Sequence, residues 1–307
     1  MALDTAAATT ALRGLTQKFD EGTESYTPFY PSVCSVRPSD GADEQYALLG
    51  AMPGVREWLG DRQFNKLRAA DFTIKNKEWE TSLEIERTKI EDDRLSFYND
   101  VLGELGVEAV AHPDELLFSL VVAGESQAGF DGQFFFDTDH AWGDSGNQSN
   151  DLSYAKAGAL PTEDEFRGAY HQARAAMLAF KRDNGKPFVR PTIKPLSGLQ
   201  LWVPPQLEEV AHKALFKDLV AGGETNIVLD RPQILTVTHL TDAAKFYLIN
   251  PTSRIRPFVF QARRPLMRKM KGLDDHEFKN VKFMADARYN VGYGAWWNAV
   301  LTTFTGP

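Results

Sequence analysis

The sequence predicts an α+β protein that combines an elongated domain with a compact α/β subdomain. Two strand patterns and one helix pattern lead to this prediction. Residues 79–85 and 281–293 alternate between apolar and polar side chains, whereas residues 97–112 carry apolar side chains at helical spacing. The later strand has thirteen residues, which span about 43 Å at roughly 3.3 Å each. A strand of that length needs a long partner, so we expect the early and late strands to share one domain.

Composition places the chain among globular proteins without membrane or disulfide features. Its 307 residues with 43% hydrophobic content suffice for a real core, and no run of eighteen apolar residues exists. The first four residues lack a signal-peptide pattern, so we expect synthesis in the cytosol. Cys34 is the single cysteine, which excludes an intramolecular disulfide and a cysteine-based metal cage. The net charge of −8 argues against a broad surface that neutralises nucleic-acid phosphates.

The first 88 residues read as a helix, an arm and a hairpin. Residues 2–20 carry Leu12, Leu15 and Phe19 on one helical face. Residues 20–43 contain three prolines between aromatic residues and predict an irregular arm that lies on another surface. Residues 46–88 predict a long hairpin with an elaborated tip. The apolar phase of its second strand, from residue 71, changes near residues 76–77, which indicates a bulge or bend.

A long helix follows this hairpin. Acidic residues 91–93 suit the first turn of a helix, and the helical stripe then starts. The stripe consists of Phe97, Val101, Leu105, Ala109 and His112. Pro113 is expected to end or kink the helix, with a second helical segment at residues 114–124.

Residues 126–250 alternate strands with helices and predict the α/β subdomain. Residues 134–136 read as one buried strand within a loop, and Thr162 with Glu165 forms a capping box. The helix after this box carries a stripe of apolar residues, namely Phe166, Tyr170, Ala173, Met177 and Phe180. Residues 199–203 and 234–237 predict strands, and Pro205 opens a helix. Beyond this subdomain, residues 258–262 predict a strand and residues 263–271 a basic loop.

One loop has the composition of a metal or hydrolytic site. Asp131, Asp137, Asp139, His140 and Asp144 could bind a metal that activates water. The EF-hand spacing is absent and no second histidine lies nearby, so a turn-rich loop is the favoured interpretation. Nor does the sequence contain a phosphate-binding glycine motif. We therefore predict no catalytic residue, no cofactor and no metal.

Three groups of residues are predicted to contact other subunits, an expectation that follows for the hairpin and the arm from the family resemblance given below. The first group, in the tip of the hairpin, is Arg56, Glu57, Trp58, Leu59, Phe64 and Lys66. The second group, in the arm, is Tyr26, Phe29 and Tyr30. The third group could form salt bridges between subunits, although the basic run 263–271 could alternatively touch phosphate. This group consists of Arg263, Arg264, Arg268, Lys269, Asp274 and Asp275.

The chain resembles the Mu-like prophage major head subunit family. The residues that carry this resemblance are 46–53 (YALLGAMP), 56–58, 76–77, 91–93, 113–116, 130–135 with His140, and 256–258 with Gln261, Arg263 and Arg264. The resemblance implies the tailed-phage capsid fold of the Hong Kong 97 type. In that fold the N-terminal arm would be residues 1–45, the extended loop 46–88, and the spine helix about 93–111. The peripheral domain would comprise 89–125 and 251–293, the axial domain 126–250, and residues 294–307 a C-terminal segment.

The resemblance also implies a function and partners. The chain would be a non-enzymatic shell subunit of a virion, assembled in the host cytoplasm into hexamers and pentamers that enclose DNA without sequence specificity. Its other partners would be a portal protein, a maturation protease, a decoration protein and a scaffold, which is expected to be a separate protein because only 45 residues precede the extended loop. Two alternatives stay open here. One is an encapsulin-like compartment with a protein cargo, and the other is a metal-dependent hydrolase built on Asp137, Asp139 and His140.

Overall fold

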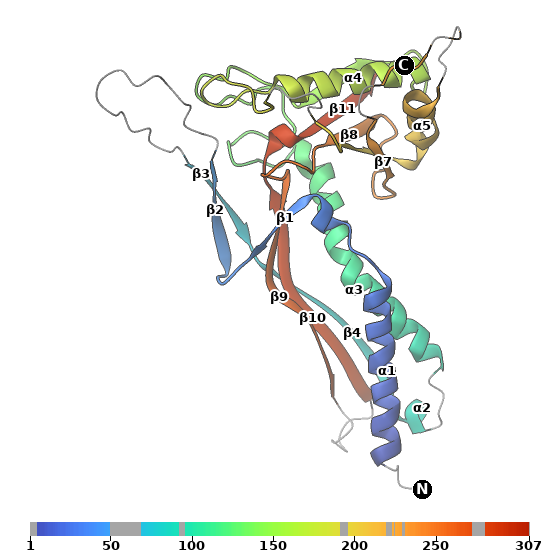
Figure 1. Cartoon of the computed structure of the whole chain (residues 1–307). Coiled ribbons are helices and arrows are strands. Elements are labelled where there is room, and N and C mark those ends of the chain that lie inside the picture. Colours follow the sequence, from blue (N-terminus) through green and yellow to red (C-terminus); the bar gives the residue numbers. More distant parts are fainter. Residues whose placement is uncertain are drawn as a thin grey trace, which may run out of the picture.

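The chain folds into a long narrow stem that carries a wider head at one end, with a hairpin projecting sideways near their junction (Figure 1). The structure is a computed structural model. It describes residues 5–49, 69–91, 96–190, 196–218, 223, 225–228, 231–271 and 280–306.

A four-stranded sheet of order β1-β9-β10-β4 forms the stem. Its strands are β1 (Cys34–Pro38), β9 (Phe258–Lys271), β10 (Asn280–Tyr293) and β4 (Lys77–Glu86). The central strand β10 pairs antiparallel with both β4 and β9, so the expected pairing of the early and late strands is confirmed. Alternate side chains of β10 are buried, as the two-residue period requires.

Strand β9 includes the basic segment that the sequence predicts as a loop, so that prediction is wrong. Residues 263–271 continue the strand because the sheet face that they line is open to solvent and accepts charged side chains. Pro265 is compatible with the strand because β1 pairs with β9 only as far as Ala262, which leaves Pro265 on an edge. The register with β10 shifts between Asp286 and Arg288, opposite this proline.

Two helices cover the other face of the stem sheet (Figure 1). They are α1 (Thr5–Ser25) and α3 (Ser96–Val122), with the short α2 (Arg87–Glu91) between β4 and α3. The predicted stripe of α1 is confirmed, since Leu15 and Phe19 are buried and the Phe19 ring lies 4.8 Å from that of Phe283. The helix runs five residues beyond the predicted end at residue 20, to Ser25.

Helix α3 continues through Pro113, so the predicted end of the helix at this residue is wrong. Proline removes one helical hydrogen bond, whereas Leu117 and Val121 in the following turns are fully buried in the head and stabilise the continued helix. The predicted stripe is confirmed in part, since Leu105 and Ala109 pack against the core of the stem. Leu102 is the fully buried residue of the first turns, while Phe97 is 69% exposed. Of the acidic residues 91–93, Glu91 ends α2 rather than starting the long helix, and residues 92–93 lie outside the described residues.

The arm is more regular than the sequence predicts. After α1 it forms a short 3-10 turn (Tyr30–Ser32) and then β1, which pairs parallel with β9. The hairpin follows as β2 (Asp43–Leu49) and β3 (Ala69–Lys75), a separate two-stranded sheet. Asn76 separates β3 from β4 and bonds back to the arm, so the predicted change of phase marks the passage from one sheet to another.

The head contains a five-stranded sheet of order β5-β11-β8-β6-β7. Its strands are β5 (Asp151–Ala155), β6 (Gln200–Val203), β7 (Gln233–Thr236), β8 (Lys245–Ile249) and β11 (Ala299–Thr305), and its helices are α4 (Glu163–Ala179) and α5 (Glu208–Phe216). The capping box of Thr162 and Glu165 is confirmed. All five residues of the predicted α4 stripe are buried.

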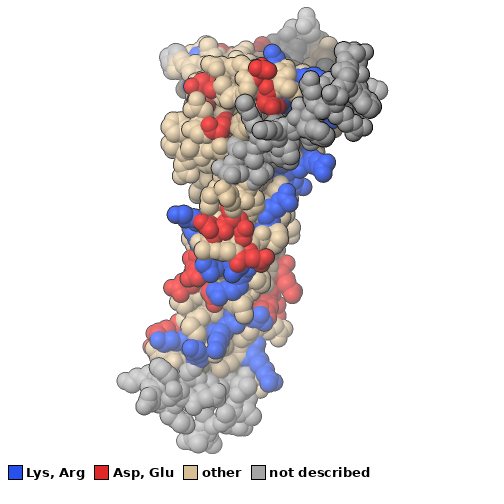
Figure 2. All heavy atoms as spheres, turned by 90° about the vertical axis from the view of Figure 1, so that its left-hand side faces the viewer, with Lys and Arg blue, Asp and Glu red and all other residues tan. Residues whose placement is uncertain are grey.

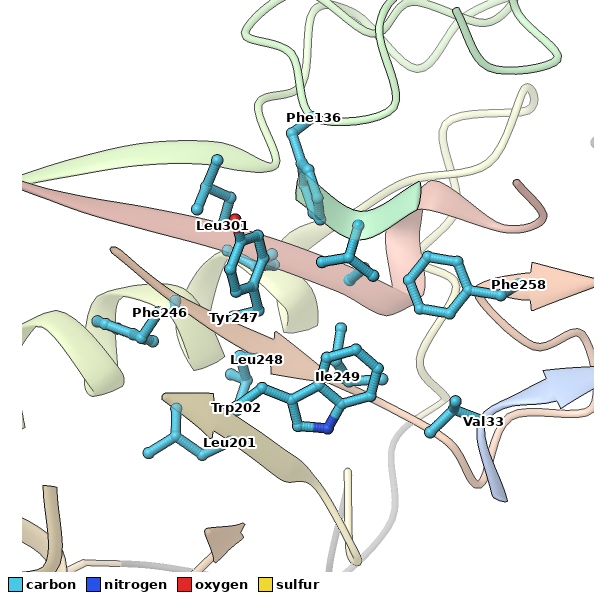
Figure 3. Close-up of a cluster of buried hydrophobic side chains, with 14 of the residues drawn as sticks. Val33, Phe136, Leu201, Trp202, Phe246, Tyr247, Leu248, Ile249, Phe258 and Leu301 are labelled. Atoms are coloured by element: carbon cyan, nitrogen blue, oxygen red, sulfur yellow. The ribbon is translucent and has the colours of Figure 1, made fainter. Parts of the chain in front are cut away.

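The C-terminal segment joins the head, and the aromatic loop departs from its prediction. Strand β11, within the C-terminal segment that the resemblance implies, lies between β5 and β8 of the head sheet. The predicted strand at residues 134–136 is wrong, because Phe135 and Phe136 are buried from a loop while Phe134 is 45% exposed. Figure 3 shows Phe136, Trp202 and Ile249 of the head in one cluster with Val33 of the arm and Phe258 of the stem. Head and stem therefore share a hydrophobic core.

Candidate functional site

A buried carboxylate fixes the arm to the middle of the long helix. Asp114 lies on α3 and is 3% exposed. It accepts hydrogen bonds from the Tyr26 hydroxyl at 2.8 Å, the Phe29 amide at 2.8 Å and the Tyr30 amide at 2.6 Å. Burial and the hydrogen bond to this carboxylate raise the pKa of Tyr26 to about 12. Three donors satisfy the buried charge, so the arm has one defined path across its own helix.

The aromatic residues of the arm pack within their own chain. The Tyr30 ring lies 4.1 Å from that of Phe260, and the Phe29 ring lies 5.6 Å from that of Trp202. Within their own chain these side chains are half-buried. A further contact between Tyr26, Phe29 or Tyr30 and another subunit stays a prediction.

Glycines allow α1 and α3 to cross at backbone contact. A Cβ atom added to Gly106 would overlap the Phe19 carbonyl oxygen and lie 2.9 Å from the Thr23 nitrogen. A Cβ added to Gly22 would overlap the Gly103 carbonyl oxygen in the same way. Because backbone atoms cannot turn aside, these positions accept only glycine at this crossing. The N-terminal helix α1 therefore packs directly against the backbone of α3 in the stem.

The predicted metal or turn loop holds its histidine inside a hydrogen-bonded core. His140 is fully buried, with its Nδ1 atom 2.7 Å from Asp131 and its Nε2 atom 3.1 Å from the Asn150 side-chain oxygen. Its ring stacks on Trp296 at 4.0 Å. Asn150 in turn donates to the carbonyl oxygens of Phe135 and Ala299. His140 therefore connects the loop to the segment that leads into β11.

The acidic residues of this loop differ in hydrogen bonding and in exposure. Burial opposes the ionisation of Asp137, but amide hydrogen bonds from Thr138 and Phe134 outweigh it and hold the pKa of Asp137 below its ordinary value. Asp139 is exposed. Within the described ranges, no group of three or more His, Cys, Asp or Glu side chains is placed to hold a metal ion. The loop geometry thus suits turn formation, with Asp139 facing solvent and His140 buried.

The solvent-facing side of the stem sheet carries charges of both signs. Figure 2 shows most of the acidic and basic side chains of this view along the narrow stem rather than on the head. Three of the predicted inter-subunit cations have partners inside the chain: Arg264 pairs with Asp286, Arg268 with Asp20, and Arg263 contacts Asp40 at 3.9 Å. A further contact of these three arginines with a neighbouring subunit stays a prediction. Lys269 has no ion pair in the part of the chain that the structure describes, and residues 274–275 lie outside it.

A cavity of about 170 Å³ lies between α3 and the stem sheet. Trp79, His112, Ala285 and Tyr289 line it. The His112 Nδ1 atom is 2.7 Å from the Tyr289 hydroxyl. Burial lowers the pKa of His112, whereas Glu115 and Glu108 act in the opposite direction. The imidazole of His112 and the hydroxyl of Tyr289 are hydrogen-bond partners of each other. We therefore interpret the cavity as a packing gap between helix and sheet.

Among the described residues, side-chain hydrogen bonds anchor the hairpin toward its base. Gln261 donates to the Ile74 carbonyl oxygen and accepts from the Tyr46 hydroxyl, while Asn290 donates to the Lys75 carbonyl oxygen. Beyond this base, β2 and β3 pair only with each other among the described strands. The predicted contact residues of the tip, Arg56, Glu57, Trp58, Leu59, Phe64 and Lys66, lie outside the described residues.

Sequence reasoning missed the two polar residues that organise these contacts, Asp114 and Asn150. The sequence did contain a signal for Asp114. This acid precedes the apolar segment 116–122, and a carboxylate that is buried with such a segment needs hydrogen-bond donors. Asn150 gave no such signal, because asparagine is common in turn-rich segments. In the described residues, no helix is long and apolar enough to span a bilayer.

Comparison with known proteins matches nearly the whole chain to one family. The model of the family "Mu-like prophage major head subunit gpT" matches residues 9–165, 159–240 and 237–303. The Mu-like prophage FluMu major head subunit of Haemophilus influenzae is 39% identical over 140 residues, 46% of each chain. The major capsid protein of Escherichia phage Mu is 36% identical over 122 residues, 40% of each chain. Each alignment spans less than half of the relative's own length.

The fold also matches solved structures of phage capsids. The procapsid protein of bacteriophage JBD30 superposes with a TM-score of 0.57 and 24% identity, over 98% of this chain and 76% of that one. The fold is therefore that of tailed-phage capsid proteins, the Hong Kong 97 type, as the sequence resemblance implies.

Proposed function

Because the chain belongs to the family of Mu-like prophage major head subunits, we propose that it is the major capsid protein of a tailed phage or prophage. In this role, copies of the chain assemble into hexamers and pentamers of an icosahedral shell around double-stranded DNA. We assign the chain no catalytic activity and no cofactor. Its place is the virion, after assembly in the host bacterial cytoplasm.

The observation that carries this proposal is the hairpin that leaves the body of its own subunit. Figure 1 shows β2 and β3 projecting from the junction of stem and head. A two-stranded hairpin is only marginally stable without a further surface to cover it. In the proposed shell, the neighbouring subunit supplies that surface, and the apolar tip residues Trp58, Leu59 and Phe64 become buried there.

The shape and charge of the subunit suit a container. The stem, with α1 and α3 on one face of a long sheet, is the proposed peripheral domain, and the head is the proposed axial domain. An acidic chain of net charge −8 offers a wall along which packaged DNA moves without tight binding. A scaffold, a maturation protease, a portal protein and a decoration protein are the further partners that we propose for this shell.

Removal of the hairpin tip tests the proposal. We expect a variant that lacks residues 53–67, bridged by a short turn, to fold but to form no shells. Fully burying a large apolar side chain contributes roughly 1.5–3 kcal/mol, and every subunit of a shell repeats the contact. The triple substitution W58S/L59S/F64S keeps the loop and should also prevent assembly. Leu160→Ser, which removes a 43% exposed leucine from the head, is the matched control.

Circular dichroism and sedimentation separate the possible outcomes. A folded, unassembled deletion variant beside an assembling Leu160→Ser control supports the proposal. An unfolded deletion variant would make the tip part of the monomer core, and a variant that still forms shells would remove the assigned contact. Particles that contain protein cargo and no nucleic acid would identify an encapsulin-like compartment instead.

A further inference from the structure

We propose that two oppositely charged rows on the stem sheet join neighbouring subunits side by side, the basic row of one copy against the acidic row of the next. This inference rests on the proposed shell function and names a surface and a partner, a second copy of the chain. The basic row consists of Arg264, Lys269 and Lys271 on β9. The acidic row consists of Glu78, Glu80, Glu84 and Glu86 on β4.

The strand register places both rows on the same solvent-facing side of the sheet. In β10, Phe283 and Ala285 point toward the helices and are buried. Their neighbours Lys282, Met284 and Asp286 point the opposite way, and residues directly opposite one another in a sheet share a face. Lys271 lies opposite Lys282 and Lys269 opposite Met284, whereas Glu80 lies opposite Asp286 and Glu84 opposite Lys282. The rows therefore flank the middle strand, one on each side.

Pairs within the chain neutralise the middle of this face and leave both margins charged. Lys282 pairs with Glu84 at 3.0 Å, and Arg288 contacts Glu78 at 3.5 Å. Arg264 pairs with Asp286. Four exposed side chains then have no ion pair or hydrogen bond in the described part of the chain: Glu80 and Glu86 in the acidic row, Lys269 and Lys271 in the basic row.

The surplus charges are unfavourable inside one subunit. Lys271 lies opposite Lys282, and Glu80 lies opposite Asp286. Like charges directly opposite in a sheet are destabilising. A partner that brings the opposite sign to each margin would offset both repulsions.

Both margins are open to such a partner. Strand β4 ends the sheet, and β1 covers β9 only as far as Ala262, which leaves residues 263–271 of β9 as an edge among the described strands. Met267 on this edge is 55% exposed and adds an apolar contact between the cations. Complementary charge steers such margins together through their side chains.

Charge complementarity favours a head-to-tail contact over a two-fold contact. A side-by-side two-fold contact would place each margin against its own copy, acid on acid or base on base. A repeated contact of the basic margin with the next acidic margin instead closes into a ring when the rotation per subunit allows it. Rings of this kind are the capsomers of the proposed shell.

Charge reversal in one row, and then in both, tests the contact. The variants are K269E/K271E, E80K/E86K and the combination of all four changes. The control K181E/K186E reverses two exposed lysines of the head that have no ion pair among the described residues. Self-association is measured by sedimentation velocity at low and high salt, shells by electron microscopy, and folding by circular dichroism.

We expect each single-row reversal to raise the concentration needed for association about tenfold, since two weak attractions become repulsions. The effect should shrink in about 1 M salt, where charges are screened within roughly 3 Å. The combined variant should associate like the wild type, because its rows are again complementary. All reversals should fold, because the changes at residues 271 and 80 place opposite charges beside Lys282 and Asp286, and residues 269 and 86 are exposed.

Failure of this contact is distinguishable from failure of the shell function. Shells that form equally well in the wild type and in both single-row variants would overturn the contact and leave the function standing. Association that depends on the rows, without any shell, would support the contact and count against the function. Single-row variants that lose association and are not restored by the combination would overturn the pairing. If K269E/K271E leaves shell formation unchanged but lowers the DNA content of the shells, the basic row binds DNA phosphates. This result would also overturn the proposed contact between the two rows.

Discussion

Substituting Gly106 by alanine should separate the N-terminal helix from the stem. In an isolated helix this change is favourable by up to about 1 kcal/mol, because alanine is the better helix former. Here the added methyl group would overlap the Phe19 carbonyl oxygen and approach the Gly22 Cα atom to 3.1 Å. All nearby atoms belong to the backbone of α1, so the whole helix must move.

The magnitude follows from the displacement. Carbon atoms in contact are separated by about 3.5–4.0 Å, so α1 must retreat by roughly 1 Å. A gap of that size forfeits a quarter to a half of the dispersion attraction of every side chain that faces it. Leu15 and Phe19, each 1% exposed, lie in this interface. We therefore expect the free energy of unfolding to fall by about 1–3 kcal/mol, the usual cost of overpacking.

The assay compares two alanine substitutions on touching helices. Gly14 is exposed on α1 and an added Cβ meets nothing within 4 Å, so Gly14→Ala should raise the free energy of unfolding by up to about 1 kcal/mol. Urea unfolding of unassembled subunits, followed by tryptophan fluorescence, gives both values. Limited proteolysis at the N-terminus reports whether α1 has detached. A Gly106→Ala protein as stable as the wild type would refute the close crossing of α1 and α3.

Other predictions concern the hydrogen-bonded centres and the buried thiol. Asp114→Asn places an amide among three donors and should lower the free energy of unfolding by about 1–3 kcal/mol, measured in urea; an unchanged value would contradict its role in holding the arm. His140→Ala should lower the free energy of unfolding by about 2 kcal/mol or more, and Asp139→Ala should lower it by less than about 0.5 kcal/mol. Equal losses would contradict the assignment of a structural role to the buried histidine alone. The lowered pKa of His112 means that the unfolded chain takes up its proton first, so stability should fall as the pH drops below about 6.5. His112→Gln should flatten that decline, and an identical pH profile would exclude this imidazole as its source. Burial raises the pKa of the Cys34 thiol, so it should react with a thiol reagent only in denaturant and give no disulfide-linked dimer on non-reducing gels.

The sequence determines the parts of the fold that depend on period and caps. The alternation of residues 281–293 required a long strand with a long partner, and β10 has both. The Thr162 capping box and the apolar stripe behind it defined α4 without tertiary information. These signals are local, because each residue reports its own face or its own turn.

The remaining features depend on partners distant in the sequence. Pro113 is compatible with α3 because the turns after it are buried in the head, which no local pattern reveals. The aromatic residues of the arm looked unpartnered, although Asp114 and Phe260 lie far along the chain. The basic segment 263–271 lacks a clean alternation because both its margin and one face are open to solvent. Short strands such as β5 and β11 become recognisable only through their pairing.

Cryo-electron microscopy of particles from cells that express the full chain tests the shell function most directly. We expect closed icosahedral shells in which every subunit shows α1 docked on its own α3 and the hairpin lying on a neighbouring subunit. Subunits that stay monomeric at high concentration, and form no shell together with the scaffold, would contradict it.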